Sequence, residues 1–181
     1  MMFKYLQKTA ALVTLLLLSG IVLAEEPGLG DDGTTNYEFK KKKWKEQEVT
    51  IPALPKKKHL VALQFPNSRL KYFIDLKSIS VGKKDRVARY TVVIESTSGV
   101  QNILYEAIRC HEKDYKTYAF SISGQPFKKM NTPKWRLIQG SGVNKYRQVL
   151  FDHFICKNSA VRYKAKDIIQ VLKYPPENQS F

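Results

Sequence analysis

Short apolar runs dominate the chain from His59 onward, and polar, turn-forming residues separate them. Each run is rich in β-branched and aromatic residues, which favour extended strands. The runs are LVALQF, LKYFID, RVARYTVVI, VQNILYEAIRC, YKTYAFSI and KWRLI. Turn formers interrupt them at positions 66–68, 82, 98–99, 124–126 and 131–133. Because no helical pattern lies between the runs, they predict an antiparallel β-sheet.

The apolar spacing changes near the C-terminus. Five residues recur at helical spacing and predict one buried helix face: Tyr146, Val149, Leu150, His153 and Phe154. A second short helix is expected to begin with Asp167 as its cap, with Gln170 three residues on, and to end before the prolines at 175 and 176. The chain therefore predicts a single α+β domain, with an antiparallel sheet as its core and short C-terminal helical segments.

A hairpin is predicted around the polar loop at positions 96–99. A two- or four-residue loop there would place Arg89 opposite Glu106 and Tyr90 opposite Tyr105. Such an arrangement matches an ion pair and an aromatic pair across neighbouring strands. Since Glu106 lies among apolar neighbours, it is expected to be partly buried, and Arg89–Glu106 is predicted to be a structural ion pair rather than a catalytic one.

The N-terminus has the pattern of a secretory signal peptide over residues 1–24. Lys4 and Lys8 precede an apolar run at 10–24, and small residues precede a cleavage point between Ala24 and Glu25. The alternative, a retained anchor, is disfavoured because the run is shorter than the ~20 residues that a spanning helix needs. The mature protein is expected to be periplasmic or secreted. Residues 25–43 are expected to form a flexible linker and basic arm, 44–174 the folded domain, and 175–181 a tail.

The positive charge adds a class of partner to this picture. The chain carries 31 Lys and Arg against 16 Asp and Glu, a net charge of +15. For an exported protein, this charge favours anionic lipid head groups, lipopolysaccharide or other acidic envelope polymers. The alternative is a solvated basic surface without a dedicated partner. The candidate polyanion-binding residues are Lys40, Lys41, Lys42, Lys43, Lys56, Lys57, Lys58, Lys83, Lys84 and Arg86.

The two cysteines, Cys110 and Cys156, point to a disulfide in an oxidising compartment. Zinc is the alternative, with His111 and His153 completing the ligand set. It is disfavoured because Cys110 and His111 are adjacent on a strand and point to opposite faces.

No familiar catalytic motif stands out, and no cofactor or metal is expected. Ser141 lies between glycines, but the spacing differs from that of a nucleophile elbow. A non-catalytic binding or scaffolding protein is therefore favoured. The alternative is a hydrolase of unfamiliar type that uses Asp75, Glu106 or His111. Specific nucleic-acid recognition is disfavoured because strand alternation buries about half of the aromatic residues beside the basic ones.

Four segments together resemble the cryptic neisserial plasmid protein one-like family. They are IPALP at 51–55, the long run at 73–110, KTYAF at 116–120 and PKWRLI at 133–138. The resemblance covers residues 44–172. It implies a small exported protein of Gram-negative bacteria and supplies no reaction. The chain departs from the family pattern at 83–86, which replaces a glycine-rich segment with KKDR, and at Ala107, which replaces a glycine.

Overall fold

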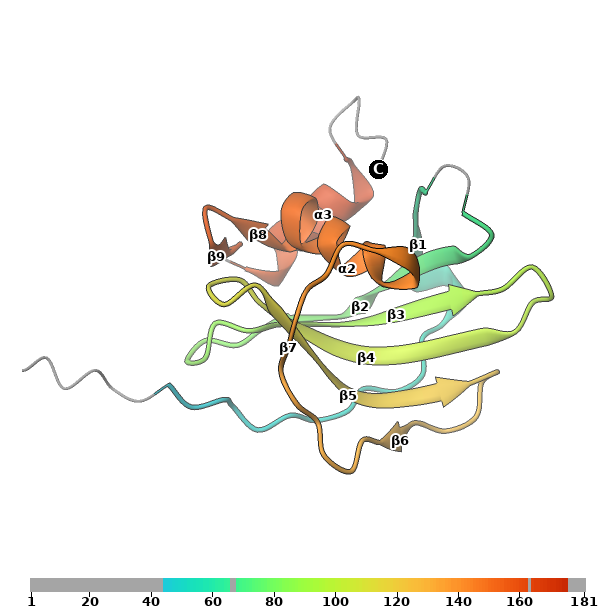
Figure 1. The fold of residues 1–181 in the computed structure, drawn as a ribbon, viewed down its shortest axis with the longest axis horizontal. Coiled ribbons are helices and arrows are strands. Elements are labelled where there is room, and N and C mark those ends of the chain that lie inside the picture. The colour runs from blue at the N-terminus through green and yellow to red at the C-terminus, as the bar shows by residue number, and fades with distance from the viewer. Residues whose placement is uncertain (1–43, 66–67, 163, 176–181) are drawn as a thin grey trace, which may run out of the picture. The chain divides into compact units, whose positions relative to one another are not determined.

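A computed structural model describes residues 44–65, 68–162 and 164–175 of the chain (Figure 1). Most of the described strands form one antiparallel sheet, in which the first six lie in chain order, and the last two form a separate hairpin. Two short helical segments follow the sheet in the sequence. The predicted α+β domain with an antiparallel core is confirmed.

Five strands make up most of the sheet, in the order in which they occur in the chain. They are β1 (Leu60–Leu63), β2 (Lys71–Val81), β3 (Ala88–Glu95), β4 (Gln101–Arg109) and β5 (Asp114–Ile122). A short 3₁₀ turn, η1 (Lys57–His59), precedes β1. Two short strands, β6 (Lys128–Lys129) and β7 (Arg136–Leu137), both pair with β5. A separate hairpin consists of β8 (Cys156–Lys157) and β9 (Ala160–Val161).

The predicted helix around Tyr146 is present, although it is not uniform. A 3₁₀ turn, η2 (Gly142–Asn144), leads into α2 (Lys145–Val149), which continues as a π-helical segment, η3 (Leu150–Ile155). The last helix, α3, spans Ala165–Lys173 and therefore begins before Asp167. Asp167 is its third residue, and its carboxylate accepts the backbone N–H of Lys164 at 3.0 Å. The prediction that Asp167 itself is the cap was wrong by three positions.

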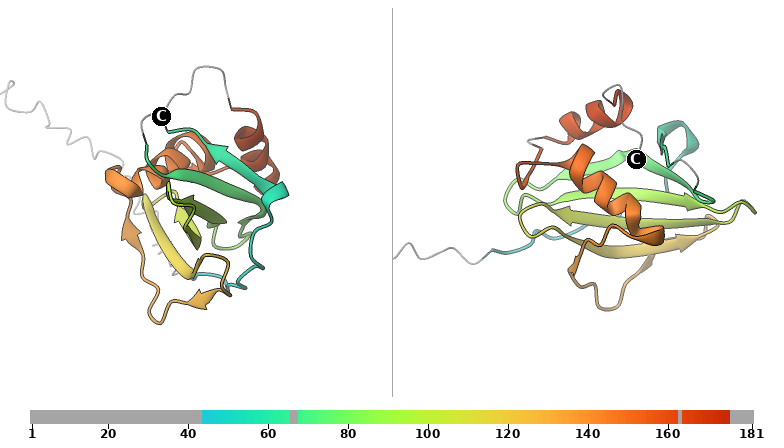
Figure 2. Two further views of the ribbon diagram at one scale, coloured as in Figure 1. Left: turned by 90° about the vertical axis from the view of Figure 1, so that its right-hand side faces the viewer. Right: turned by 45° about the horizontal axis from the view of Figure 1, so that its top comes forward.

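Each face of the sheet is covered by a different part of the chain. On one face, Tyr90, Val92 and Ile108 belong to a core that includes Tyr146 and Leu150 from the helical segments. Figures 1 and 2 show α2 and α3 over this face and the chain that begins at Trp44 running across the other. A smaller core on that second face includes Tyr105, Ala107 and Tyr118, with Val49, Ile51 and Trp135 packed against it. The sheet is thus buried on both sides, which explains the near-continuous apolar character of β3 and β4.

The predicted register of the β3–β4 hairpin was wrong by one residue. Arg89 lies opposite Ala107, and Tyr90 lies opposite Glu106. The cause is a three-residue loop, in which Ser96 N–H donates to the Val100 carbonyl at 2.9 Å and Gly99 has a φ of 80°. Such loops combine a turn with one residue in the left-handed region, a conformation that glycine adopts without strain. A one-residue shift moves every side chain to the other face, so Arg89 and Glu106 lie on opposite faces of the sheet.

Candidate functional site

A cleft of about 450 Å³ opens where three turns meet at one end of the sheet. Lys84, Asp85 and Arg86 from the β2–β3 loop form one part of its lining. Residues 109–112 at the β4–β5 turn and residues 159–161 of the β8–β9 hairpin form the others, and Trp44 completes it. Turn residues on a rigid scaffold commonly form binding sites, and the cleft combines cationic, acidic and aromatic groups.

Asp85 organises the cleft from within the β2–β3 loop. The residue is 3% exposed, and one carboxylate oxygen accepts the guanidinium of Arg89 at 2.5 Å. The backbone N–H groups of Gln47 and Val87 donate to the same carboxylate at 2.9 and 3.2 Å. Burial alone raises the pKa of Asp85, but these three hydrogen bonds outweigh burial and lower the pKa below its ordinary value. Asp85 therefore remains a carboxylate that joins the loop, the sheet and the N-terminal segment.

Gly82 makes room for this carboxylate. A Cβ atom at position 82 would overlap the Asp85 carboxylate and would lie 2.7 Å from the side-chain oxygen of Gln47. The same oxygen of Gln47 accepts the backbone N–H of Lys84 at 3.0 Å. Position 82 therefore requires glycine because of a close approach, not because of its backbone conformation.

An arginine lies between two tryptophans beside the cleft. The Arg109 guanidinium is 4.7 Å from the ring centroids of both Trp44 and Trp135. Asp114 accepts two hydrogen bonds from Arg109, at 3.0 and 2.5 Å, and this bonding raises the pKa of Arg109. Trp44 Nε1–H donates to the carbonyl of Asp85 at 3.1 Å. These contacts hold the Trp44 ring in place, although it stays 43% exposed.

The N-terminal segment is also held on the sheet by Glu46. Its carboxylate accepts Lys116 Nζ at 2.6 Å and the hydroxyl of Tyr118, and it lies 4.0 Å from Arg89. Burial, followed by the hydrogen bond to Glu46, raises the pKa of Tyr118 above its ordinary value. These contacts fix Glu46, two residues after Trp44, and so support the position of the Trp44 ring.

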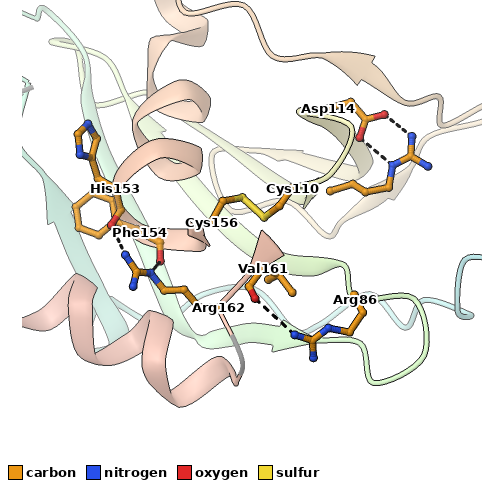
Figure 3. Close-up of a disulfide and its surroundings, with 9 residues drawn as sticks. Arg86, Cys110, Asp114, His153, Phe154, Cys156, Val161 and Arg162 are labelled. Carbon is orange, nitrogen blue, oxygen red and sulfur yellow. Dashed lines mark hydrogen bonds and ion pairs between the residues drawn. A yellow bond between two sulfur atoms is a disulfide. The ribbon is translucent and has the colours of Figure 1, made fainter. Parts of the chain in front are cut away.

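The predicted disulfide is present beside the cleft. Cys110, at the end of β4, is bonded to Cys156, with the two Cα atoms 5.7 Å apart (Figure 3). It ties the sheet to the β8–β9 hairpin, whose Val161 carbonyl accepts an Arg86 hydrogen bond at 3.5 Å. The zinc alternative loses both of its thiolate ligands, because each sulfur is already bonded to the other.

Left-handed backbone conformations gather around the cleft. Among the described non-glycine residues with positive φ, Arg86 (57°) and Ser159 (59°) line the cleft. Lys113 (52°) and Asn158 (51°) are the immediate neighbours of lining residues. Such conformations cost about 1–2 kcal/mol in residues with a Cβ atom and persist where the surroundings impose them.

The predicted ion pair between Arg89 and Glu106 does not exist. Arg89 pairs with Asp85, and Glu106 pairs with Arg147 of α2, at 2.6 Å. Glu106 is fully buried on the helix-covered face, as the apolar residues around it suggested, and it also accepts the hydroxyls of Tyr90 and Tyr146. Sequence spacing could not reveal a partner 41 residues away.

The three groups proposed for a hydrolase lie apart. Asp75 is on β2 opposite Leu60 of β1, where its side chain accepts the N–H of Lys77 at 3.3 Å. Glu106 is enclosed beneath α2, and His111 lies in the exposed turn at the cleft. The arrangement therefore does not join them in one constellation.

The predicted basic clusters lie at different places in the structure. Lys84 and Arg86 line the cleft, with Lys83 exposed next to them. Lys56, Lys57 and Lys58 are exposed before β1, away from the loop that follows β2. Lys40, Lys41, Lys42 and Lys43 lie outside the described residues, as do the proposed cleavage residues Ala24 and Glu25.

Trp44, Asp85 and Arg109 were not predicted to belong to one site. A weak signal existed, since an aspartate among three basic residues at 83–86 and a tryptophan beside a lysine run both invite a search for partners. Their meeting depends on contacts between residues 38 and 41 positions apart. In the part of the chain that the structure describes, no helix has the length and apolarity needed to cross a bilayer.

Similarity to known proteins is found at the level of a family model. No protein with a curated description and no solved structure matches the chain. One family model, that of the CNP1-like family, matches residues 39–173. This match includes the sheet, the disulfide and both C-terminal helical segments. The chain therefore belongs to the CNP1-like family.

Proposed function

We propose that the protein is an exported, non-catalytic binding protein of the cell envelope, and that the cleft beside the disulfide binds anionic envelope polymers. The observation that carries this proposal is the combination of Lys84 and Arg86 with a fixed, half-exposed Trp44 in one cleft. The net charge, +15 for the whole chain and +13 without the two lysines of residues 1–24, adds long-range attraction to a polyanion.

Two further observations support the location. The first 24 residues have the pattern of a secretory signal, and the chain contains a disulfide, which is typical of oxidising compartments. Disulfides are rare in reduced compartments, where thiols prevail. Fusion of residues 1–24 to a reporter that works only after export would test this part of the proposal directly.

The binding test uses the mature chain from Glu25 and vesicles that contain lipopolysaccharide or, as a blank, a neutral lipid alone. Binding is measured by vesicle co-sedimentation at about 0.01 M and about 0.15 M salt, between which the Debye length falls from about 30 to about 8 Å. We expect binding to the anionic vesicles to fall steeply over this range.

A matched pair of variants separates the cleft from the overall charge. One carries Lys83→Gln, Lys84→Gln and Arg86→Gln. The other carries Lys56→Gln, Lys57→Gln and Lys58→Gln, which removes the same charge at a position away from the cleft. The first triple variant should lose most of the binding, and the second only a small part. Equal losses would contradict a role for the cleft, and binding that ignores salt would contradict the electrostatic mechanism.

A further inference from the structure

We infer that the cleft recognises one ring of an acidic saccharide, with the ring stacked on Trp44 and its acid group held by Lys84 and Arg86. This inference rests on the proposed function and names the ligand chemistry of the same cleft. The acid group is a phosphate, as in a phosphorylated sugar of lipopolysaccharide, or a carboxylate, as in a uronic acid.

Trp44 is exposed but held in place by its neighbours. A large apolar ring that is 43% exposed is usually mobile at a surface, but this ring has three fixed neighbours. Arg109 lies 4.7 Å from its centroid, Trp135 packs edge-on at 6.2 Å, and its Nε1–H donates to Asp85. An aromatic surface that is held in place while exposed offers a ligand contact area without a further loss of side-chain entropy.

The cleft lining contains charged side chains in two different roles. Asp85 is neutralised by Arg89, and Arg109 by Asp114, so both pairs act as supports. Lys84 and Arg86 are both exposed and lie on either side of the buried Asp85 in the same loop, and Arg86 also donates a hydrogen bond to the Val161 carbonyl at 3.5 Å, which holds its guanidinium at the cleft. Because these two cations flank the immobile Asp85, they suit the binding of a single compact anionic group.

The cleft lining also contains polar side chains. His111, Glu112 and Ser159 are exposed in the same cleft, and they supply hydrogen-bond acceptors as well as donors. A polyhydroxylated ring uses both kinds of group. A continuous polyphosphate chain would instead place negative charges next to the carboxylate of Glu112, and the two would repel each other. A volume of about 450 Å³ admits a small ring system and is too small for a folded partner.

Soluble probes test this inference on the mature chain. The chain has two tryptophans, and Trp135→Phe leaves Trp44 as the fluorescent reporter. Glucose 1-phosphate and glucuronate are each titrated, together with glucose, which lacks the acid, and inorganic phosphate or acetate, which lack the ring. We expect saturable changes in Trp44 emission with the two acidic sugars, and binding at least tenfold weaker with each fragment. Comparison of the two acidic sugars then tells phosphate from carboxylate.

Substitution of the ring gives an independent readout by calorimetry on the chain with Trp135 intact. Trp44→Leu should weaken the better acidic sugar about fivefold, which corresponds to about 1 kcal/mol, whereas Trp44→Phe should keep most of the affinity. Far-UV circular dichroism and the melting temperature of each variant show whether the domain is intact. If both variants are folded and Trp44→Phe loses as much affinity as Trp44→Leu, the stacking role of Trp44 is overturned.

Other outcomes separate this inference from the proposed function. If inorganic phosphate alone binds as tightly as glucose 1-phosphate, the cleft is a plain anion site and the sugar inference falls. If adenosine monophosphate binds more tightly than either acidic sugar, the platform serves a nucleobase and the inference is overturned. In both cases cleft-dependent vesicle binding would still support the proposed function. A further outcome is that the acidic sugars bind, but the variant with Lys83→Gln, Lys84→Gln and Arg86→Gln binds vesicles as well as the unchanged protein does. That result would support the sugar site and refute the binding of envelope polymers by the cleft.

Discussion

Replacement of Glu106 by glutamine tests how the buried charge on the helix-covered face contributes to stability. Glu106 is fully buried and accepts five hydrogen bonds. Two come from Arg147, at 3.0 and 2.6 Å, and the others come from the hydroxyls of Tyr90, Thr117 and Tyr146 at 2.8–3.2 Å. Glutamine keeps the volume of the side chain but removes the charge and turns an NH₂ group toward these donors.

The size of the effect follows from what the substitution leaves behind. Arg147 is 6% exposed, and its guanidinium lies 4.0 Å from the ring centroid of Tyr115. Without the carboxylate, this guanidinium is a buried charge with no counterion. Breaking a buried pair by removing one partner costs about 3–5 kcal/mol. Since small domains are stable by only about 5–15 kcal/mol, this is a large share of the total.

Urea unfolding followed by circular dichroism measures the change. The control is Glu95→Gln, which breaks a partly exposed pair with Lys71 at 3.8 Å, keeps an oxygen for the hydrogen bond from Gln101, and should cost at most about 1 kcal/mol. The double variant Glu106→Leu with Arg147→Met removes both charges and should recover only part of the loss, because the hydroxyls of Tyr90, Thr117 and Tyr146 lose their acceptor. A loss under about 1 kcal/mol for Glu106→Gln, with an unchanged m-value, would refute this account.

Three further predictions concern the cleft. Replacing Cys110 and Cys156 by serine should lower the free energy of unfolding by up to about 4 kcal/mol, the chain-entropy value for their separation of 46 positions; an unchanged midpoint in urea would contradict a stabilising disulfide. Because the pKa of Asp85 is lowered on folding, its carboxylate stabilises the protein above its unfolded pKa of about 3.9, and this contribution is lost as the pH falls toward the folded pKa. Asp85→Asn should therefore flatten the stability profile below about pH 4, and an equally steep profile would assign the acid sensitivity to other groups. Gly82→Ala should destabilise the domain by about 1–3 kcal/mol through overlap with Asp85, whereas Lys83→Ala should leave the melting temperature nearly unchanged.

Local sequence patterns predicted the long strands and the two C-terminal helical segments, but not β6 or the β8–β9 hairpin. Alternating and continuous apolar runs predicted strands, and helical spacing from Tyr146 to Phe154 predicted the face that is buried against the sheet. The disulfide was also predictable, since the chain has two cysteines and an apparent export signal. These predictions succeed because side-chain periodicity and covalent pairing depend on residue type and local spacing.

Tertiary structure alone decided the partners of the buried charges. The register depends on the loop: the three-residue loop, with Gly99 in its left-handed position, shifts Arg89 from Glu106 to Ala107, and this local signal was not used in the prediction. Glu106 then pairs with Arg147 from the helical layer, and Arg89 with Asp85 on the opposite face.

The cleft was equally hidden from sequence analysis. Trp44 meets the loop at Asp85 because the N-terminal segment covers the second face of the sheet, where Val49 and Ile51 pack. No pattern within a short stretch of sequence encodes this approach. The sequence determined the long strands and helical segments through local periodicity, and the disulfide through its two cysteines. Only the packing of distant segments determined which charges pair and where the cleft forms, because that outcome minimises the burial cost of the whole chain.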